Sequence, residues 1–227
     1  MAHSGIEVLF QGKNFLRLMG GLWTSVWIAG VSLGFGLLLG TFLGVLRTLK
    51  NAVLRVVLRL YLEFFRIVPT IVLLFLVYYI LPRQFHVEVS AEWMAVLAFS
   101  LWISAEFSDI IRGALESVPK HQREAGLALG LTKGQLFVHV LMPQAFMLEL
   151  PAAINLATRV VKTTSLLMII SVMDVINVGQ QIIEANNQQY PSGVFWICGF
   201  IFMLYFIVDY PLSLISKMLQ QKFSANL

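Results

Sequence analysis

Apolar runs separated by short polar stretches organise this chain of 227 residues. A transmembrane helix needs about 20 mostly apolar residues. Four runs meet this length directly, at about 22–46, 61–81, 93–111 and 194–215. The first run holds several glycines, and glycines four residues apart share a helix face that a second helix can approach closely. We expect a packing role for these glycines, which are Gly30, Gly34, Gly36, Gly40 and Gly44.

The apolar stretch from 136 to 178 is harder to divide, because Pro143 and Pro151 interrupt it. A proline removes a backbone donor and bends or ends a helix. We therefore expect an amphipathic approach helix at about 135–149, then a spanning helix at about 151–170, then a partly embedded tail. This brings the prediction to five transmembrane helices in an all-α membrane protein.

Composition supports a lipid environment for most of the chain. Hydrophobic residues make up 58% of it and charged residues only 12%, whereas a soluble domain carries about 25% charged residues. The basic residues are scattered between apolar spans and form no stripe, which argues against nucleic-acid binding. The single cysteine, Cys198, excludes an internal disulfide.

The distribution of Lys and Arg predicts the orientation in the membrane, because short cytoplasmic loops carry an excess of both. The links after the first and third spans, with the C-terminal tail, hold ten of them: Arg47, Lys50, Arg55, Arg59, Arg112, Lys120, Arg123, Lys133, Lys217 and Lys222. The other side holds three: Lys13, Arg17 and Arg83. The pattern predicts an N-terminus outside, a C-terminus inside, and a cytoplasmic segment at 112–134.

We expect one transmembrane domain over 20–216, with an N-terminal segment at 1–19 and a cytoplasmic tail at 217–227. Residues 7–12 (Glu-Val-Leu-Phe-Gln-Gly) resemble the recognition site of a viral protease that is used to remove tags. A tag remnant and a native amphipathic start are both open interpretations. No cleavable signal peptide is predicted, since the first apolar run is long enough to stay in the membrane.

Four charged residues lie inside predicted spans, where charge is costly and indicates function. Glu106 and Asp109 belong to the third span, and Arg159 and Lys162 to the fourth. One interpretation is mutual ion pairing between the two helices. The other is a polar path in which Glu106 and Arg159 hold the ammonium and carboxylate of a zwitterion, because Arg binds a carboxylate through two hydrogen bonds.

Further polar side chains accompany these charges. Asn155 recurs with Arg159 and Lys162 at helical spacing, so the three share one helix face. Thr163 and Ser165 follow closely. Hydroxyls in a span often bond back to the carbonyls of their own helix, and we expect this of some of them. The predicted solute path comprises Glu106, Asn155, Arg159, Lys162, Thr163 and Ser165.

The sequence contains no motif for nucleotide chemistry. A phosphate-binding loop of the type G-x-x-x-x-G-K-[ST] is absent. The four histidines lack metal-ligand spacing, and no Ser-His-acid arrangement is evident. We expect no catalytic residue, no metal site and no cofactor in this chain.

The segment at about 119–130 predicts a short helix between the third and fourth spans. Pro119 suits the first turn of a helix, and Gly130 suits its end as a left-handed cap. Small residues lie between them, so another surface can come close. The residues alone allow two interpretations: a docking surface for a partner or an ordinary surface helix.

Three motifs in register resemble those of ABC-importer permeases. Glu124-Ala125-Gly126, Gly130 and Leu141-Met142-Pro143 match the Glu-Ala-Ala, Gly and Leu-Pro of the family's EAA loop. The surroundings are similar to the subgroup for polar amino acids, through Arg112-Gly113, the stretch 117–125 (Ser-Val-Pro-Lys-His-Gln-Arg-Glu-Ala), Leu150-Pro151, Asn155 and the stretch 162–166 (Lys-Thr-Thr-Ser-Leu). The resemblance is continuous from about 104 to 170 and weaker from 20 to 80.

The resemblance implies a type I ABC importer permease fold in the bacterial cytoplasmic (inner) membrane. It implies that 119–130 is a coupling helix for a separate ATPase, with coupling residues Arg123, Glu124, Ala125, Gly126, Gly130 and Pro143. The implied partners are two copies of an ABC ATPase that bind ATP and Mg, a second permease copy or sister chain, an extracytoplasmic solute-binding protein and a polar amino acid. The permease itself is implied to be non-catalytic.

The departures from the subgroup pattern fall on the implied solute path. Gly126 replaces the second alanine of the loop, a small change. Glu106 replaces a common tyrosine, Leu156 replaces an acid and Arg159 replaces a small or neutral residue. They leave the particular amino acid open.

Two other classes of protein remain as alternatives. A gated channel, or another multi-pass protein without ATPase coupling, shares polar residues in spans but needs no docking helix. An intramembrane enzyme needs a catalytic constellation, which the sequence does not offer. Co-purification with an ATPase separates these classes.

Overall fold

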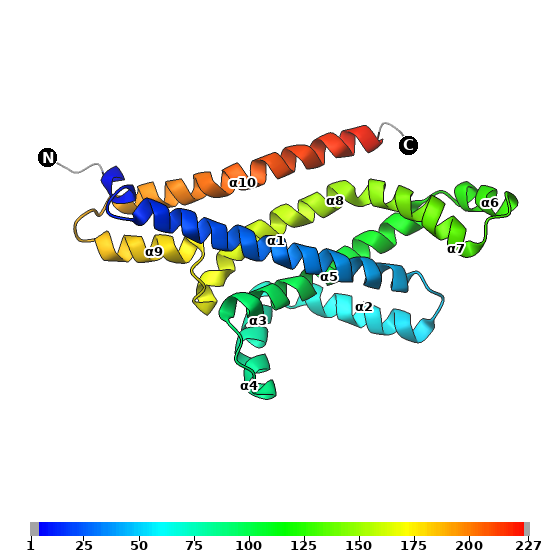
Figure 1. The fold of residues 1–227 in the computed structure, drawn as a ribbon, viewed down its shortest axis with the longest axis horizontal. Helices are drawn as coiled ribbons and strands as arrows, with labels where there is room; N and C mark the ends of the chain where they lie inside the picture. The colour runs from blue at the N-terminus through cyan, green and yellow to red at the C-terminus, as the bar shows by residue number, and fades with distance from the viewer. Residues whose placement is uncertain (1–4, 225–227) are drawn as a thin grey trace. The chain divides into compact units, whose positions relative to one another are not determined.

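The structure is a computed structural model that describes residues 5–224, and helices account for its regular structure there (Figure 1). In chain order these are η1 (Ile6–Leu9), α1 (Asn14–Arg47), α2 (Ala52–Ile67), α3 (Thr70–Phe75), η2 (Leu76–Ile80), α4 (Leu81–Phe85), α5 (Ala91–Ser117), α6 (Lys120–Ala128), α7 (Lys133–Leu136), η3 (Phe137–Leu141), α8 (Met142–Thr163), η4 (Thr164–Ile170), α9 (Val175–Asn186) and α10 (Gly193–Ser224). The all-α prediction is confirmed.

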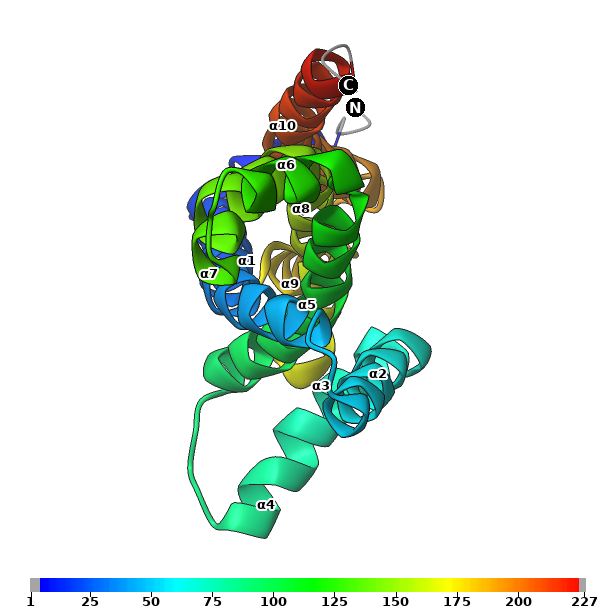
Figure 2. The same cartoon turned by 90° about the vertical axis from the view of Figure 1, so that its right-hand side faces the viewer.

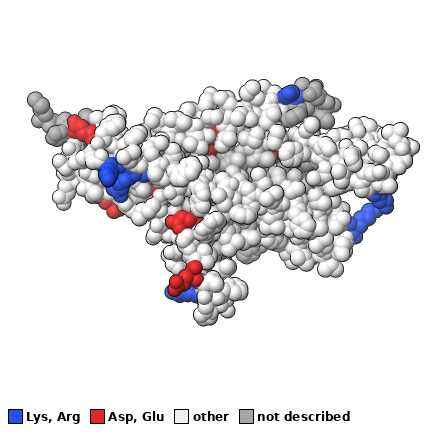
Figure 3. Space-filling view, viewed as in Figure 1, with Lys and Arg blue, Asp and Glu red and all other residues white. Residues whose placement is uncertain are grey.

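The helices that could cross a membrane agree with the hydropathy pattern. Four stretches in the described range are long and apolar enough: Asn14–Arg47, Ala91–Ser117, Lys133–Ile170 and Gly193–Lys222. The pair Ala52–Ile67 and Thr70–Phe85 adds a fifth if it forms one broken span. On the face drawn in Figure 3, charged side chains form only a few small groups among uncharged surface.

The second predicted span is interrupted, and its helix begins earlier than expected. α2 begins at Ala52, where the Asn51 side chain accepts a hydrogen bond from the Leu54 N–H at 3.1 Å. It ends at Ile67, because Pro69 lacks an N–H and holds the preceding Val68 in an extended conformation (φ −69°, ψ 123°). A new helix, α3, then starts at Thr70.

The predicted division of the fourth span at Pro151 is wrong. α8 runs unbroken through Pro151, and the helical path from 133 to 170 contains no break. Membrane helices tolerate an internal proline when neighbouring groups satisfy the freed backbone. The tail after 170, for which a partly embedded position stays a prediction, contains a separate helix, α9.

The chain forms two compact units, each made of three stretches of sequence. Unit 1 combines residues 5–32, 71–99 and 158–211, and unit 2 combines residues 33–70, 100–157 and 212–224. An apolar cluster in unit 1 joins η1, α1, α9 and α10: Val8, Leu9, Leu18, Val175, Val178, Ile182, Ile197, Ile201 and Leu204. The N-terminal segment therefore contributes Val8 and Leu9 to a buried core.

Close contact between α1 and α5 builds unit 2. A Cβ added at Gly36, Gly40 or Gly44 would lie 2.5 to 2.8 Å from a side-chain atom of α5. The predicted packing role is therefore confirmed for these three glycines. At Gly30 and Gly34 the packing role stays a prediction, since a Cβ at either would meet no atom of the described residues within 4 Å.

Candidate functional site

The predicted coupling helix exists as α6, and both of its ends are defined by backbone geometry. Pro119 precedes the helix with φ −56° and ψ 140°. At the other end Gly130 adopts φ +83°, which favours glycine. Its N–H donates to the Leu127 carbonyl at 3.0 Å, and the Leu131 N–H donates to the Gly126 carbonyl at 3.1 Å. This pair of bonds is a Schellman cap, so the predicted left-handed end is confirmed.

Side chains fix α6 to the rest of unit 2. Arg123 donates from Nη2 to the Leu115 carbonyl of α5 at 2.6 Å. Gln144 of α8 donates to Gln122 at 3.4 Å. Figure 2 shows α6 turning back beside α7. These bonds tie α6 to the helices on both sides of it in the sequence.

Gly126 is the point at which α6 packs against the next turn. It is buried, and an alanine methyl there would lie 2.5 Å from Leu136 Cδ1. The end of the Leu136 side chain thus occupies the space that the family's usual alanine would take. The departure at Gly126 is therefore compensated within the same unit.

The outer side of α6 is exposed and partly apolar. Glu124 and Ala125 are exposed, and Leu127 and Leu129 are exposed by 51% and 83%. These two leucines were not among the predicted coupling residues, although apolar residues in a polar segment are a visible signal in the sequence. Pro143 is also exposed, in the first turn of α8. A rigid helix with exposed leucines beside a carboxylate is suited to docking on a protein surface.

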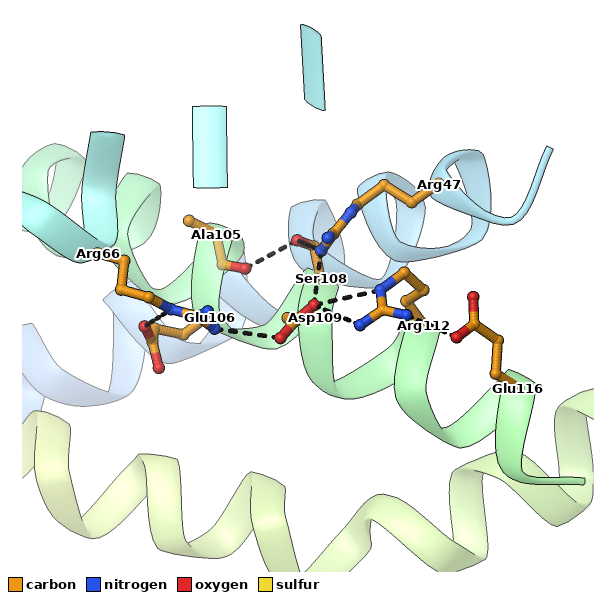
Figure 4. Close-up of polar contacts among 8 residues, drawn as sticks. All are labelled: Arg47, Arg66, Ala105, Glu106, Ser108, Asp109, Arg112 and Glu116. Atoms are coloured by element: carbon orange, nitrogen blue, oxygen red, sulfur yellow. Dashed lines mark hydrogen bonds and ion pairs between the residues drawn. The ribbon is translucent and has the colours of Figure 1, made fainter. Parts of the chain in front are cut away.

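A charged cluster joins α1, α2 and α5 within unit 2 (Figure 4). Asp109 accepts from three guanidinium groups: Arg47 at 3.1 Å, Arg66 at 3.1 Å and Arg112 at 3.0 Å. Arg112 also pairs with Glu116 at 2.6 Å. Arg47 ends α1 and has a side chain only 9% exposed. The cluster therefore links the C-terminal ends of α1 and α2 to the C-terminal half of α5.

These ion pairs differ from the pairing considered from the sequence. The predicted partners of Asp109 were the bases of the fourth span, whereas its partners in the structure come from α1, α2 and its own helix. Glu106 has an ion-pair partner in the same unit, since Arg66 Nε lies 3.8 Å from its Oε1.

The remaining residues of the predicted solute path lie on α8 and η4. Asn155, Arg159 and Lys162 are all exposed along one unbroken helix, as their spacing predicted. Thr163 donates its hydroxyl to the Arg159 carbonyl at 2.8 Å, the alternative expected for a hydroxyl in a span. Ser165 is half-buried in η4.

Two aspartates that the sequence analysis passed over are buried in unit 1. Asp174 is fully buried and accepts from the N–H groups of Ile176 and Asn177 at 3.2 and 3.0 Å, which caps α9. Burial raises the pKa of Asp174 to about 6. Asp209 lies in α10 and is 8% exposed. The rule that flagged Glu106, an acid inside an apolar run, applied equally to Asp209.

Comparison with known proteins agrees with this geometry. Residues 36–223 match the family model of the binding-protein-dependent transport system inner membrane component. The chain is 33% identical over 214 residues to the L-cystine transport system permease protein TcyB of Bacillus subtilis (strain 168), covering 94% of this chain and 89% of that protein. It is 31% identical over 206 residues to the glutamine transport system permease protein GlnP of Escherichia coli (strain K12), covering 90% and 92%.

Solved structures share the fold. A chain from the crystal structure of an amino acid ABC transporter with histidines superposes with a TM-score of 0.81 and 25% identity, over 92% of this chain and 95% of that chain. A chain of the inward-facing MetNI methionine ABC transporter has a TM-score of 0.68 at 19% identity, a likeness of fold alone. The predicted type I ABC importer permease fold and multi-pass inner-membrane location are therefore confirmed. The family match over most of the length, together with these relatives, places the chain in the family of binding-protein-dependent transport system inner membrane components.

Proposed function

We propose that this chain is the non-catalytic permease subunit of an ATP-driven importer of polar amino acids. The observation that carries the proposal is α6, a capped helix that Arg123 fixes to unit 2 and that leaves Glu124, Leu127 and Leu129 exposed. The relatives named for L-cystine and glutamine transport support the substrate class. A second permease, identical or a sister chain, completes the pathway, and an extracytoplasmic binding protein delivers the solute.

In this proposal α6 docks on a cytoplasmic ATPase, one for each permease. Glu124, Ala125, Leu127 and Leu129 supply the contact surface, since all four are exposed. Arg123, Gly126 and Gly130 keep the helix rigid, and Pro143 lies in the first turn of α8, next to Gln144, which bonds to α6. ATP and Mg are bound by the ATPase. Closure of the two ATPases pulls the coupling helices together, and the attached helices move between inward- and outward-facing states.

Glu106, Asn155, Arg159, Lys162, Thr163 and Ser165 form the proposed solute path. Arg159 offers a bidentate site for the substrate carboxylate, and Glu106 offers a counter-charge for the ammonium. The N-terminus lies outside and the C-terminus inside, in keeping with the excess of basic residues in the links on one side.

The coupling role is tested with Glu124→Ala and Leu129→Ala in the full chain, co-expressed with its ATPase. Each removes one exposed contact, so we expect less co-purified ATPase and at least a tenfold loss of substrate-stimulated ATP hydrolysis. Glu88→Ala is the matched control for co-purification, because Glu88 is exposed in the link before α5. Full coupling in both variants would contradict the docking role, and solute flux without ATP would indicate a channel.

The solute path is tested separately with Arg159→Ala. We expect uptake to fall to background while the ATPase still co-purifies, because the guanidinium acts on solute and not on assembly. Lys217→Ala, which removes an exposed base of α10, should leave uptake unchanged. Normal uptake by Arg159→Ala rules out the carboxylate clamp, and loss of assembly assigns Arg159 a structural role.

A further inference from the structure

A cavity of about 700 Å³ lies within unit 2, between α1, α2, α5, α6 and η3. Its charged lining is dominated by arginines: Arg47, Arg55, Arg59, Arg66, Arg112 and Arg123. Three acids also line it: Glu63, Asp109 and Glu116. The lining therefore carries an excess of three positive charges, which an anion would neutralise.

The acids that line the cavity do not neutralise all six arginines. Asp109 is shared by Arg47, Arg66 and Arg112, and Glu116 pairs with Arg112. Arg55 and Arg59 make no side-chain hydrogen bond or ion pair to any residue between 5 and 224. Both are exposed and stand one helical turn apart on α2. Two neighbouring guanidinium groups at the mouth of a basic cavity suit a phosphate, which each can bind through two hydrogen bonds.

The surface of α2 beside these arginines is apolar. Leu58, Leu62 and Phe65 are buried against unit 2. A second stripe is exposed: Val53, Val56, Val57, Leu60, Phe64 and Ile67. At 100° per residue, the arginine stripe lies between the buried stripe and the exposed apolar stripe. A ligand with a phosphate at one end and hydrocarbon at the other matches this order of surfaces.

We propose that Arg55 and Arg59, at the mouth of this cavity, bind the phosphodiester headgroup of an anionic phospholipid, whose acyl chains cover the exposed apolar stripe of α2. The predicted orientation places both arginines at the cytoplasmic leaflet, where basic pockets between membrane helices bind anionic headgroups. The charge excess selects an anionic lipid, and the apolar stripe selects a lipid over free phosphate. The site does not depend on the identity of the transported solute.

The test uses the full chain, purified with its ATPase and placed in nanodiscs. One set of nanodiscs contains phosphatidylcholine alone, and in the other about 30% of the lipid is the anionic phosphatidylglycerol. We expect phosphatidylglycerol to raise the melting temperature of the wild type. We expect Arg55→Gln with Arg59→Gln to lose this rise and to bind phosphatidylglycerol at least tenfold more weakly by native mass spectrometry. The matched control, Lys217→Gln with Lys222→Gln, removes two exposed bases of α10 and should behave as the wild type.

Three results would overturn the assignment. Equal protection of the wild type and the arginine double variant would place the lipid elsewhere. Protection by inorganic phosphate in pure phosphatidylcholine, equal to that by phosphatidylglycerol, would make the cavity a site for the free anion. Equal stability of the wild type in the two nanodiscs would mean that no anionic lipid binds. If the double variant does not fold, Arg59→Gln alone is expected to weaken phosphatidylglycerol binding about threefold, and unchanged binding contradicts the proposal.

Discussion

Asp109 of unit 2 and Asp174 of unit 1 are held in opposite ways. In unit 2, Asp109 is surrounded by three guanidinium groups from α1, α2 and α5. In unit 1, Asp174 has no cation within ion-pair distance among residues 5–224, and backbone N–H groups at the start of α9 hold it. The same side chain thus fastens separate helices together in one unit and shapes a single helix end in the other.

This difference has a physical consequence for each acid. Ion pairs to several helices make Asp109 part of the tertiary packing, so its loss leaves partly buried cations without a partner. A cap of N–H groups only partly offsets the burial of Asp174, which is why its pKa rises to about 6. We expect unit 2 to be sensitive to the removal of charge and unit 1 to be sensitive to pH.

The largest effect should come from Asp109→Asn. The substitution keeps the shape and removes the charge shared by three arginines, and breaking a buried ion pair costs about 3 to 5 kcal/mol. Asp109 is 27% exposed, so we expect a smaller loss, about 2 kcal/mol, equivalent to about 5 °C in melting temperature. Glu116→Gln, at a side chain 58% exposed, serves as the control and should shift melting by less than about 2 °C. Equal shifts would show that the cluster does not hold the helices.

A slightly smaller loss of stability is expected from Gly40→Ala, which tests the contact between α1 and α5. The new Cβ would lie 2.8 Å from Phe107 Cβ and 3.0 Å from the Ser104 carbonyl oxygen, atoms that cannot move aside without shifting α5. Overpacking of this kind costs about 1 to 3 kcal/mol. Gly34→Ala, which meets nothing within 4 Å, is the matched control. If both variants melt alike, the α1–α5 contact is looser than the structure indicates.

Asp174→Asn should instead stabilise the protein, and only above acidic pH. The folded state binds a proton at Asp174 more tightly than the unfolded state, so wild-type stability falls as pH rises from about 4 to 6. Asparagine keeps an acceptor for the cap and carries no charge. We expect the melting temperature of the variant to lie a few degrees above that of the wild type at pH 7.5 and to equal it at pH 4.5. The measurement is thermal unfolding in detergent, followed by intrinsic fluorescence at both pH values. Asp174→Ala, which loses the cap, should melt lower than Asp174→Asn at both values.

The smallest effect is expected from Gly126→Ala, which restores the family's usual alanine. The one close contact of the methyl group is the end of the Leu136 side chain, at 2.5 Å, and this side chain can change rotamer. We expect less than about 1 kcal/mol of lost stability and unchanged ATPase coupling. A large loss of coupling would mean that the spacing of α6 from α7 is set more tightly than these contacts indicate.

Local features of the fold were predictable because they depend on neighbouring residues. The apolar runs predicted the long helices, and Pro119 and Gly130 predicted the ends of α6. Prediction was poorer at prolines, because Pro69 ends a helix while Pro151 lies inside one. Whether a helix survives a proline depends on which groups satisfy the freed backbone, and those groups come from elsewhere in the fold.

By itself the sequence determined the membrane-spanning helices and the capped coupling helix, since hydrophobic length and backbone preference act within short segments. Only the tertiary structure decided which charges meet. It brought Arg47 and Arg66 to Asp109, left Arg55 and Arg59 at the mouth of a cavity, and set Leu136 against Gly126. Such pairings depend on how whole helices pack, and because many arrangements satisfy the same hydrophobic pattern, the pattern cannot choose among them.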